Sequence, residues 1–104
     1  MAESTSHAVS LKMSDFGDLL VTRDQGEHVR GVLMQLLQKH EYVDVMLDGV
    51  DAYTPSFIDE VLGKCMLAVG ADTFRRAVRL VATAPEVRKL VNLVLSNRVG
   101  SQLR

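Results

Sequence analysis

Hydrophobic and polar residues follow one another along this chain in periods that predict alternating strands and helices. Residues 8–12 alternate apolar and polar side chains, as a half-buried strand does, and residues 16–21 form a second extended candidate. We expect these two segments to pair as a hairpin around the turn at residues 13–15. Residues 24–40 repeat apolar side chains with helical periodicity, which predicts an amphipathic helix. The apolar stripe of this helix consists of Val29, Val32, Leu33, Leu36 and Leu37.

A second strand and helix come next. Residues 42–47 are largely apolar, which predicts a central strand, and residues 48–51 leave it in a turn. A helix is expected to begin at Pro55, because proline loses no hydrogen bond at a first helical position, and Thr54 is its expected cap. This second helix should end at Gly70. Its buried stripe is expected to hold Ile58, Val61, Leu62, Cys65 and Val69.

The last third of the chain predicts one more strand and one more helix. Residues 77–82 are rich in β-branched side chains, as a strand is, and residues 71–75 are expected to form only a link. Pro85 opens a third helix that should run to about Arg98. Arg98 falls on the apolar side of that helix, so it pairs either with the dipole at the helix C-terminus or with an acid of another element. The expected stripe is Val87, Leu90, Val91 and Val94.

The order of these elements predicts an α/β fold. Successive helices serve as crossovers between parallel strands, and the initial hairpin makes the sheet mixed. We therefore expect an α/β sandwich of about four strands in a mixed sheet with about three helices. The 104 residues, 47% of them hydrophobic, fit one domain over residues 1–104, with residues 1–6 as a flexible tail.

Composition narrows the classes of function. The formal charge is −1 and the pI is about 6.3, so the chain lacks the excess of positive charge that non-specific nucleic-acid binding requires. One cysteine, Cys65, and no Cys/His cluster predict a reducing compartment, with no metal and no cofactor. The sequence shows neither a secretory leader nor an apolar run long enough to span a membrane. We expect a cytoplasmic protein with no membrane partner.

Charge is divided unevenly along the chain. Residues 1–70 hold 11 acidic and 5 basic side chains (net −6), whereas residues 71–104 hold 2 acidic and 7 basic ones (net +5). Either the two parts neutralise each other across one fold, or one of them steers a charged partner.

The usual enzyme signatures are absent from the sequence. It contains no Gly-rich loop followed by Lys-Ser/Thr, no Gly-x-Ser-x-Gly elbow, no His-Glu-x-x-His pair and no dinucleotide fingerprint. Cys65 lies on a buried stripe, where a small core residue is expected rather than a nucleophile. We therefore expect a protein without catalytic residues.

Ser56 is the candidate functional residue. On a helical wheel it lies about 160° from the core residue Ile58, so it should face solvent in the first turn of the second helix. A phosphate there would meet free backbone N–H groups and the positive end of the helix dipole. Gly63 and Leu67 fall on the same face, where they would form a shallow apolar depression for a partner's helix. The alternative is an ordinary helix start with one exposed leucine.

Two motifs resemble a known family. Residues 45–56, followed by Phe-Ile-Asp-Glu-Val-Leu-Gly-Lys at residues 57–64, resemble STAS domains, the anti-sigma-factor-antagonist fold, in which a strand leads into a helix beginning Asp-Ser-Ser-Gly. The run is more similar still to the STAS-like family of unknown function, which shares a Ser-Phe-x-Asp-Glu-x-x-Gly-Lys signature. The resemblance covers about residues 14–98. An upstream Thr-Arg-x-x-Gly-x-x-x-Arg motif of that family is matched by Thr22, Arg23, Gly26 and Arg30.

The resemblance implies a STAS-like fold and a non-enzymatic regulatory module that binds another protein. In STAS antagonists the second serine of Asp-Ser-Ser-Gly is phosphorylated by a histidine-kinase-like ATPase, and phosphorylation switches binding off. Ser56 falls at the phosphoacceptor position, whereas Thr54, Pro55 and Phe57 depart from that motif. We expect an ATPase or kinase-like partner to contact the second helix. The expected contact residues are Thr54, Ser56, Phe57, Glu60, Gly63 and Leu67.

Two other functions remain open. A small-molecule or nucleotide-binding domain would use Thr22, Arg23 and Arg30 near the strand ends, where open α/β sheets bind ligands. A self-associating subunit is the other alternative, because Leu93 lies off the core stripe of the third helix and would be available to a homo-oligomer interface.

Overall fold

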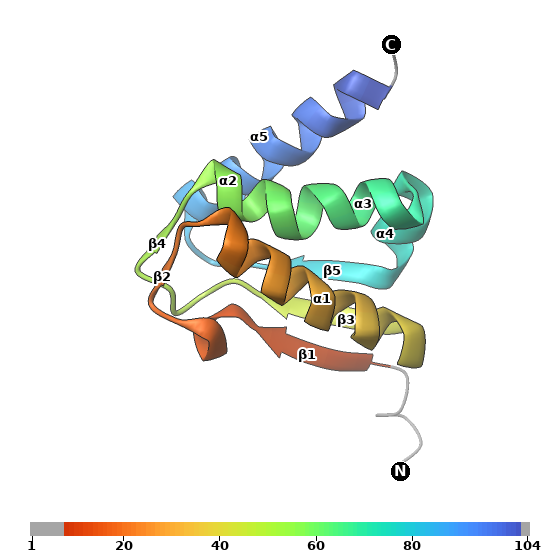
Figure 1. Ribbon diagram of the computed structural model, residues 1–104, viewed down its shortest axis with the longest axis horizontal. Helices are drawn as coiled ribbons and strands as arrows, with labels where there is room; N and C mark the ends of the chain where they lie inside the picture. The colour runs from red at the N-terminus through yellow and green to blue at the C-terminus, as the bar shows by residue number, and fades with distance from the viewer. Residues whose placement is uncertain (1–7, 103–104) are drawn as a thin grey trace.

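The computed structural model describes residues 8–102, and a three-stranded parallel sheet lies at its centre (Figure 1). The strands are β1 (Ala8–Lys12), β3 (Tyr42–Met46) and β5 (Val78–Val81), in the order β1-β3-β5. The expected central position of β3 is confirmed. The tail expected at residues 1–6 lies outside the described residues.

The two faces of this sheet have different surroundings. Leu11, Val45 and Leu80 align across the three strands on the face that packs against the helices. Tyr42 and Arg79 point to the opposite face, and both are exposed. Parallel sheets are usually covered on both faces. Within the part of the chain that the structure describes, this sheet is covered on one face.

Helices fill the connections between the parallel strands. The first connection contains α1 (Arg23–Lys39). The second contains one continuous helical stretch in three parts, which are α2 (Pro55–Ile58), a π-helical turn η3 (Asp59–Gly63) and α3 (Lys64–Val69). Both connections lead to a neighbouring parallel strand, so the expected crossover arrangement is confirmed. The π-helical turn was not expected.

Two helical segments differ from their predicted bounds. The expected link at residues 71–75 is a helix, α4 (Ala71–Ala77), which follows α3 at Gly70. Its 7 residues bury Phe74 but are too few for a periodic pattern to be recognised. The last helix, α5 (Pro85–Gln102), continues past the end expected before Gly100, because a glycine weakens a helix without terminating it.

A second, smaller sheet pairs β2 (Leu19–Leu20) with β4 (Ala52–Tyr53), again in parallel. The expected N-terminal hairpin is therefore wrong, and neither sheet is mixed. The chain leaves β1 through a 3₁₀ turn, η2 (Met13–Phe16), and then Gly17, whose φ of 143° is accessible mainly to glycine. This turn carries β2 away from β1 and towards β4.

The core lies between the main sheet and the helices. It is aliphatic, as the composition predicts, with Phe57 and Phe74 as its buried aromatic residues. No described helix is long and apolar enough to cross a membrane. The side chains with relative exposure below 2% are Met13, Leu20, Val29, Leu33, Val43, Val45, Leu47, Phe57, Ile58, Val61, Leu62 and Cys65.

Candidate functional site

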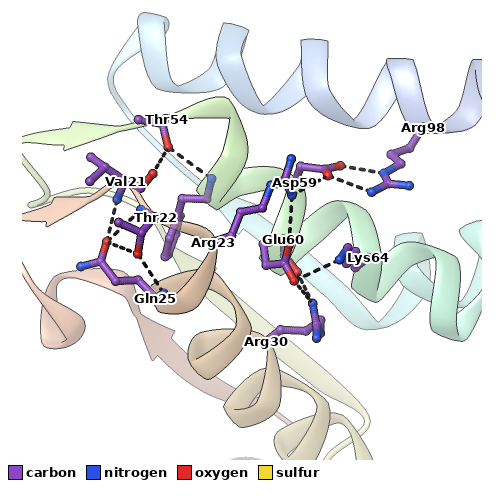
Figure 2. A network of polar contacts seen from close by, with 11 residues as sticks. Val21, Thr22, Arg23, Gln25, Arg30, Thr54, Asp59, Glu60, Lys64 and Arg98 are labelled. Carbon is purple, nitrogen blue, oxygen red and sulfur yellow. Dashed lines mark hydrogen bonds and ion pairs between the residues drawn. The ribbon is translucent and has the colours of Figure 1, made fainter.

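The two sequence motifs lie against each other in the fold, where α1 packs on the π-helical turn η3 (Figure 2). Gly26 of α1 and Glu60 of η3 mark this contact. A Cβ atom at Gly26 would lie 2.6 Å from the Cβ of Glu60 and 3.1 Å from the carbonyl oxygen of Phe57. Because non-bonded carbon atoms do not approach so closely, only glycine permits this helix spacing.

Glu60 accepts hydrogen bonds from three cationic side chains although only 5% of it is exposed. Its carboxylate oxygens lie 2.8 Å from Arg30 Nη1, 3.0 Å from Arg23 Nη1 and 3.1 Å from Lys64 Nζ. Arg30 also donates to the backbone carbonyl of Glu60 at 2.9 Å. These bonds, that of Arg30 above all, lower the pKa of Glu60 to about 2 against the opposing effect of burial. The side chain is therefore ionised throughout the physiological range.

Asp59, the preceding residue, connects η3 to α5. The Nε and Nη2 atoms of Arg98 lie 2.6 Å and 2.8 Å from its two carboxylate oxygens, a bidentate ion pair. This pair is the main cause of the lowered pKa of Asp59. Gly63 makes room for it, because a Cβ there would lie 2.5 Å from Asp59 Oδ1. Of the two pairings expected for Arg98, the one with an acid of another element is confirmed.

We call this group of charged side chains the carboxylate cluster. Arg23 joins its two acids, since its Nη1 also lies 3.4 Å from Asp59. Four cations surround two carboxylates, and each carboxylate oxygen accepts at least one hydrogen bond. A fully paired carboxylate is poorly suited to take a proton from a substrate, so the cluster fixes α1, η3 and α5 relative to one another. Its members are Arg23, Arg30, Asp59, Glu60, Lys64 and Arg98.

The first turns of two helices are joined beside the cluster (Figure 2). Thr22 caps α1 and forms a capping box with Gln25. Thr54 caps α2: its hydroxyl accepts from the Phe57 N–H at 3.2 Å and donates to the Val21 carbonyl at 2.6 Å. The start of α2 is therefore held from both sides, by its own first turn and by the segment that precedes α1.

Leu19, Val21, Pro55 and Ser56 lie around this helix start, and we call them the β2–α2 patch. Leu19 is 58% exposed and Val21 36%, whereas Leu20 between them is fully buried. Pro55 is exposed and Ser56 is half-buried. Leu19 and Val21 were not among the predicted contact residues. Their alternation with Leu20 in an extended segment is the signal that points to them.

The contact face expected on the second helix is mostly covered. Phe57 is fully buried, Glu60 belongs to the carboxylate cluster, and Gly63 is buried beneath the ion pair that joins η3 to α5. The prediction that Gly63 faces solvent beside an apolar depression is therefore wrong, because α1 and α5 pack on the flanks of this helix. Leu67 is exposed, at 38%, as predicted.

Of the three residues expected to form a ligand site at the start of α1, Arg23 and Arg30 meet at Glu60, whereas Thr22 contacts Gln25. Their polar groups are engaged within the protein: Thr22 in the capping box, and both arginines with Glu60. An anion bound here would have to compete with Glu60 and Asp59 for the same guanidinium groups. The geometry therefore favours a structural role for these three residues.

Other chemistry-bearing residues are inert or dispersed. Among the described residues, no three His, Cys, Asp or Glu side chains are grouped so that they could hold a metal ion. Cys65 is buried, its Sγ lies 3.5 Å from Met34 Sδ, and burial raises the pKa of its thiol to about 11. A thiol with so high a pKa is a weak nucleophile. Leu93 is 59% exposed, so its predicted place off the core stripe is confirmed.

No family model, no curated protein and no solved structure matches this chain. A function is therefore inferred from the chain's own residues. Two features bear on the function. One is the carboxylate cluster, and the other is the exposed β2–α2 patch, whose backbone is held by the caps of α1 and α2.

Proposed function

We propose that this protein is a non-enzymatic regulatory module of STAS-like type that binds a protein partner through the β2–α2 patch. The observation that carries the proposal is the exposure of Leu19 and Val21, 58% and 36%, in the segment that Thr54 joins to the start of α2. Exposed apolar side chains that lie together on a fixed backbone are typical of protein interfaces.

The rigidity of this region supports the proposal. Thr54 joins the start of α2 to Val21 through a hydrogen bond of 2.6 Å, and β2 pairs with β4 in register. A surface that is ordered before it binds loses little conformational entropy on association. The patch therefore has the properties of a preformed docking site.

We further propose that phosphorylation of Ser56 switches this interaction, by a partner of the histidine-kinase-like ATPase class that the family resemblance implies. Ser56 lies in the first turn of the helical stretch 55–69, where the helix dipole stabilises added negative charge. The two acids that follow, Asp59 and Glu60, are both paired with cations. Their repulsion of a phosphate is therefore reduced.

Binding is tested by isothermal titration calorimetry of the purified protein with a histidine-kinase-like ATPase from the same organism. Leu19→Glu should weaken binding by about tenfold or more, as expected for an apolar anchor residue. Leu93→Glu is the matched control, since Leu93 is 59% exposed on α5 and is not part of the β2–α2 patch, and it should bind like the wild type. Equal affinity of the wild type and Leu19→Glu would exclude the β2–α2 patch as the interface.

The switch is tested by intact-mass spectrometry after incubation with the same ATPase and ATP. A mass gain of one phosphate that is absent from Ser56→Ala supports it. Modification that persists in Ser56→Ala assigns the phosphate to another residue and removes Ser56 from this role.

A further inference from the structure

A groove of about 1060 Å³ runs along the outer edge of β5, between that strand, α4 and α5. Seven consecutive residues, from Phe74 to Leu80, line it together with Tyr42 and Asp44 of β3, so the groove follows the edge of β5 and extends onto the open face of the sheet. Its aliphatic and phenyl lining consists of Met66, Phe74, Ala77, Val78, Leu80 and Leu95.

The backbone of β5 offers unused hydrogen-bonding groups to this groove. The Val81 carbonyl accepts from the Leu47 N–H at 2.8 Å, so the backbone groups of Val81 point inward to β3. In a strand, successive residues point their N–H and C=O groups to opposite sides, so those of Val78 and Leu80 point outward. The Val78 N–H donates to the Phe74 carbonyl at the end of α4, so the N–H that the edge offers to a ligand is that of Leu80. No described strand pairs with this edge. An unpaired edge of this kind is a template for another strand.

Positive charge borders the same groove. Arg75, Arg76 and Arg79 line it, and the only acid among its lining residues is Asp44, so the lining carries a net charge of +2. The Arg79 side chain remains 74% exposed although it pairs with Asp44 at 2.9 Å, and that of Arg75 is 64% exposed. These guanidinium groups are hydrated and accessible to an acidic ligand.

We propose that the β5 edge binds an extended acidic segment of a protein partner, which adds a fourth strand to the main sheet. Apolar side chains of that segment would pack on Leu80 and Leu95, and its acidic side chains would face the three arginines. A second copy of this chain is a poorer occupant of the same edge, because pairing β5 with β5 would bring both arginine groups together. The groove shares no residue with the β2–α2 patch, so this proposal stands independently of the proposed function.

The test measures binding of labelled peptides to the full chain by fluorescence anisotropy. The probe is a peptide that alternates glutamate and valine, and the comparison peptide alternates lysine and valine. We expect the acidic peptide to bind at least about tenfold more tightly, and its affinity to fall as salt is added. The double variant Arg75→Glu/Arg76→Glu should reverse this preference. Arg88→Glu, an exposed charge reversal on α5 outside the groove, should leave it unchanged.

Backbone methylation of the acidic peptide tests strand addition itself. In one version every glutamate nitrogen is methylated, and in the other every valine nitrogen. In an added strand, alternate N–H groups face β5, so one version should lose about tenfold or more in affinity while the other still binds. Such a difference cannot arise from charge, because the two methylated peptides carry the same charge. The methylation test therefore reports on the backbone of β5, whereas the Arg75→Glu/Arg76→Glu variant, which changes residues of α4, reports on charge.

Three results would overturn the proposal. Equal binding of the two methylated peptides would show a purely electrostatic association. Binding of decanoate in the groove, with no binding of the acidic peptide, would assign it to small anionic amphiphiles. Failure of the acidic peptide to bind at all, with circular dichroism showing a folded protein, would leave the edge without this role.

Discussion

Arginine side chains serve two different purposes in the carboxylate cluster and in the β5 groove. In the cluster, Arg30 is 24% exposed and lies 2.8 Å from Glu60, whose own side chain is 7% exposed. In the groove, Arg79 is 74% exposed even though its ion pair with Asp44 has a similar length. Breaking a buried ion pair is costly because it leaves a buried charge without its partner, whereas breaking an exposed pair costs little. Distance alone therefore does not separate structural arginines from those available to a partner.

Glu60→Gln should have the largest effect on stability. The substitution keeps the shape of the side chain but leaves three cations around a neutral amide in a largely buried position. Removing one partner of a buried ion network costs about 3 kcal/mol. Urea unfolding monitored by circular dichroism measures the loss as a lower midpoint.

Asp72→Asn is the matched control for Glu60→Gln. Asp72 also pairs with an arginine, Arg75, at 3.4 Å, but its side chain is 92% exposed. We expect a change below about 0.5 kcal/mol. Equal effects of the two substitutions would show that burial does not distinguish the cluster from the surface.

Acid should weaken the fold through the same carboxylate. The pKa of Glu60 is about 2 in the folded protein and 4.5 ordinarily, so the unfolded chain binds this proton more readily. The contribution of Glu60 is fully present above pH 4.5 and is lost progressively as the pH falls towards 2. Asp59, whose pKa is also lowered, adds to the loss in the same direction. Unfolding midpoints over this range should fall more steeply for the wild type than for Glu60→Gln, and parallel curves would contradict the assignment.

Two glycines of α1 provide a test with opposite signs. Gly26→Ala places a Cβ 2.6 Å from that of Glu60, and overpacking of this kind costs about 2 kcal/mol. At Gly31 an added Cβ meets nothing within 4 Å, so Gly31→Ala should stabilise the protein by about 0.5–1 kcal/mol through helix propensity. Thermal unfolding measures both changes as shifts of the melting temperature from that of the wild type, downward for Gly26→Ala and upward for Gly31→Ala. Stabilisation by Gly26→Ala would show that α1 and η3 are not held in close contact.

Elements with long periodic patterns could be predicted from the sequence. The apolar stripe of α1 predicted a helix that begins within one residue of the observed Arg23. The strand β3 was recognised because its apolar run follows that helix. By contrast, the pairing of β2 with β4 joins two-residue strands that are distant in sequence, and no local pattern encodes such a contact.

The candidate site was predictable in part. The two motifs led to Arg23, Arg30 and Glu60, which do meet, but Glu60 is buried although it was expected to contact a partner, and the helical wheel misplaced Gly63. A wheel assumes α geometry and one buried face. The π-helical turn η3 shifts the phase of the residues in and after it, and α1 and α5 cover the flanks of the helix. Neither feature can be derived from residue spacing, because both depend on how distant helices pack.

Arg79→Gln should have the smallest effect on stability and yet a measurable effect on binding. Its loss removes an exposed ion pair, so the urea midpoint should move by less than a fifth of the Glu60→Gln shift. Affinity for the acidic peptide should nevertheless fall by about two- to fivefold, because one of three arginines that attract it is removed. A large loss of stability with unchanged peptide affinity would contradict this prediction. Arg79 would then stabilise the fold, as Arg30 does, and Arg75 and Arg76 would attract the acidic peptide without it.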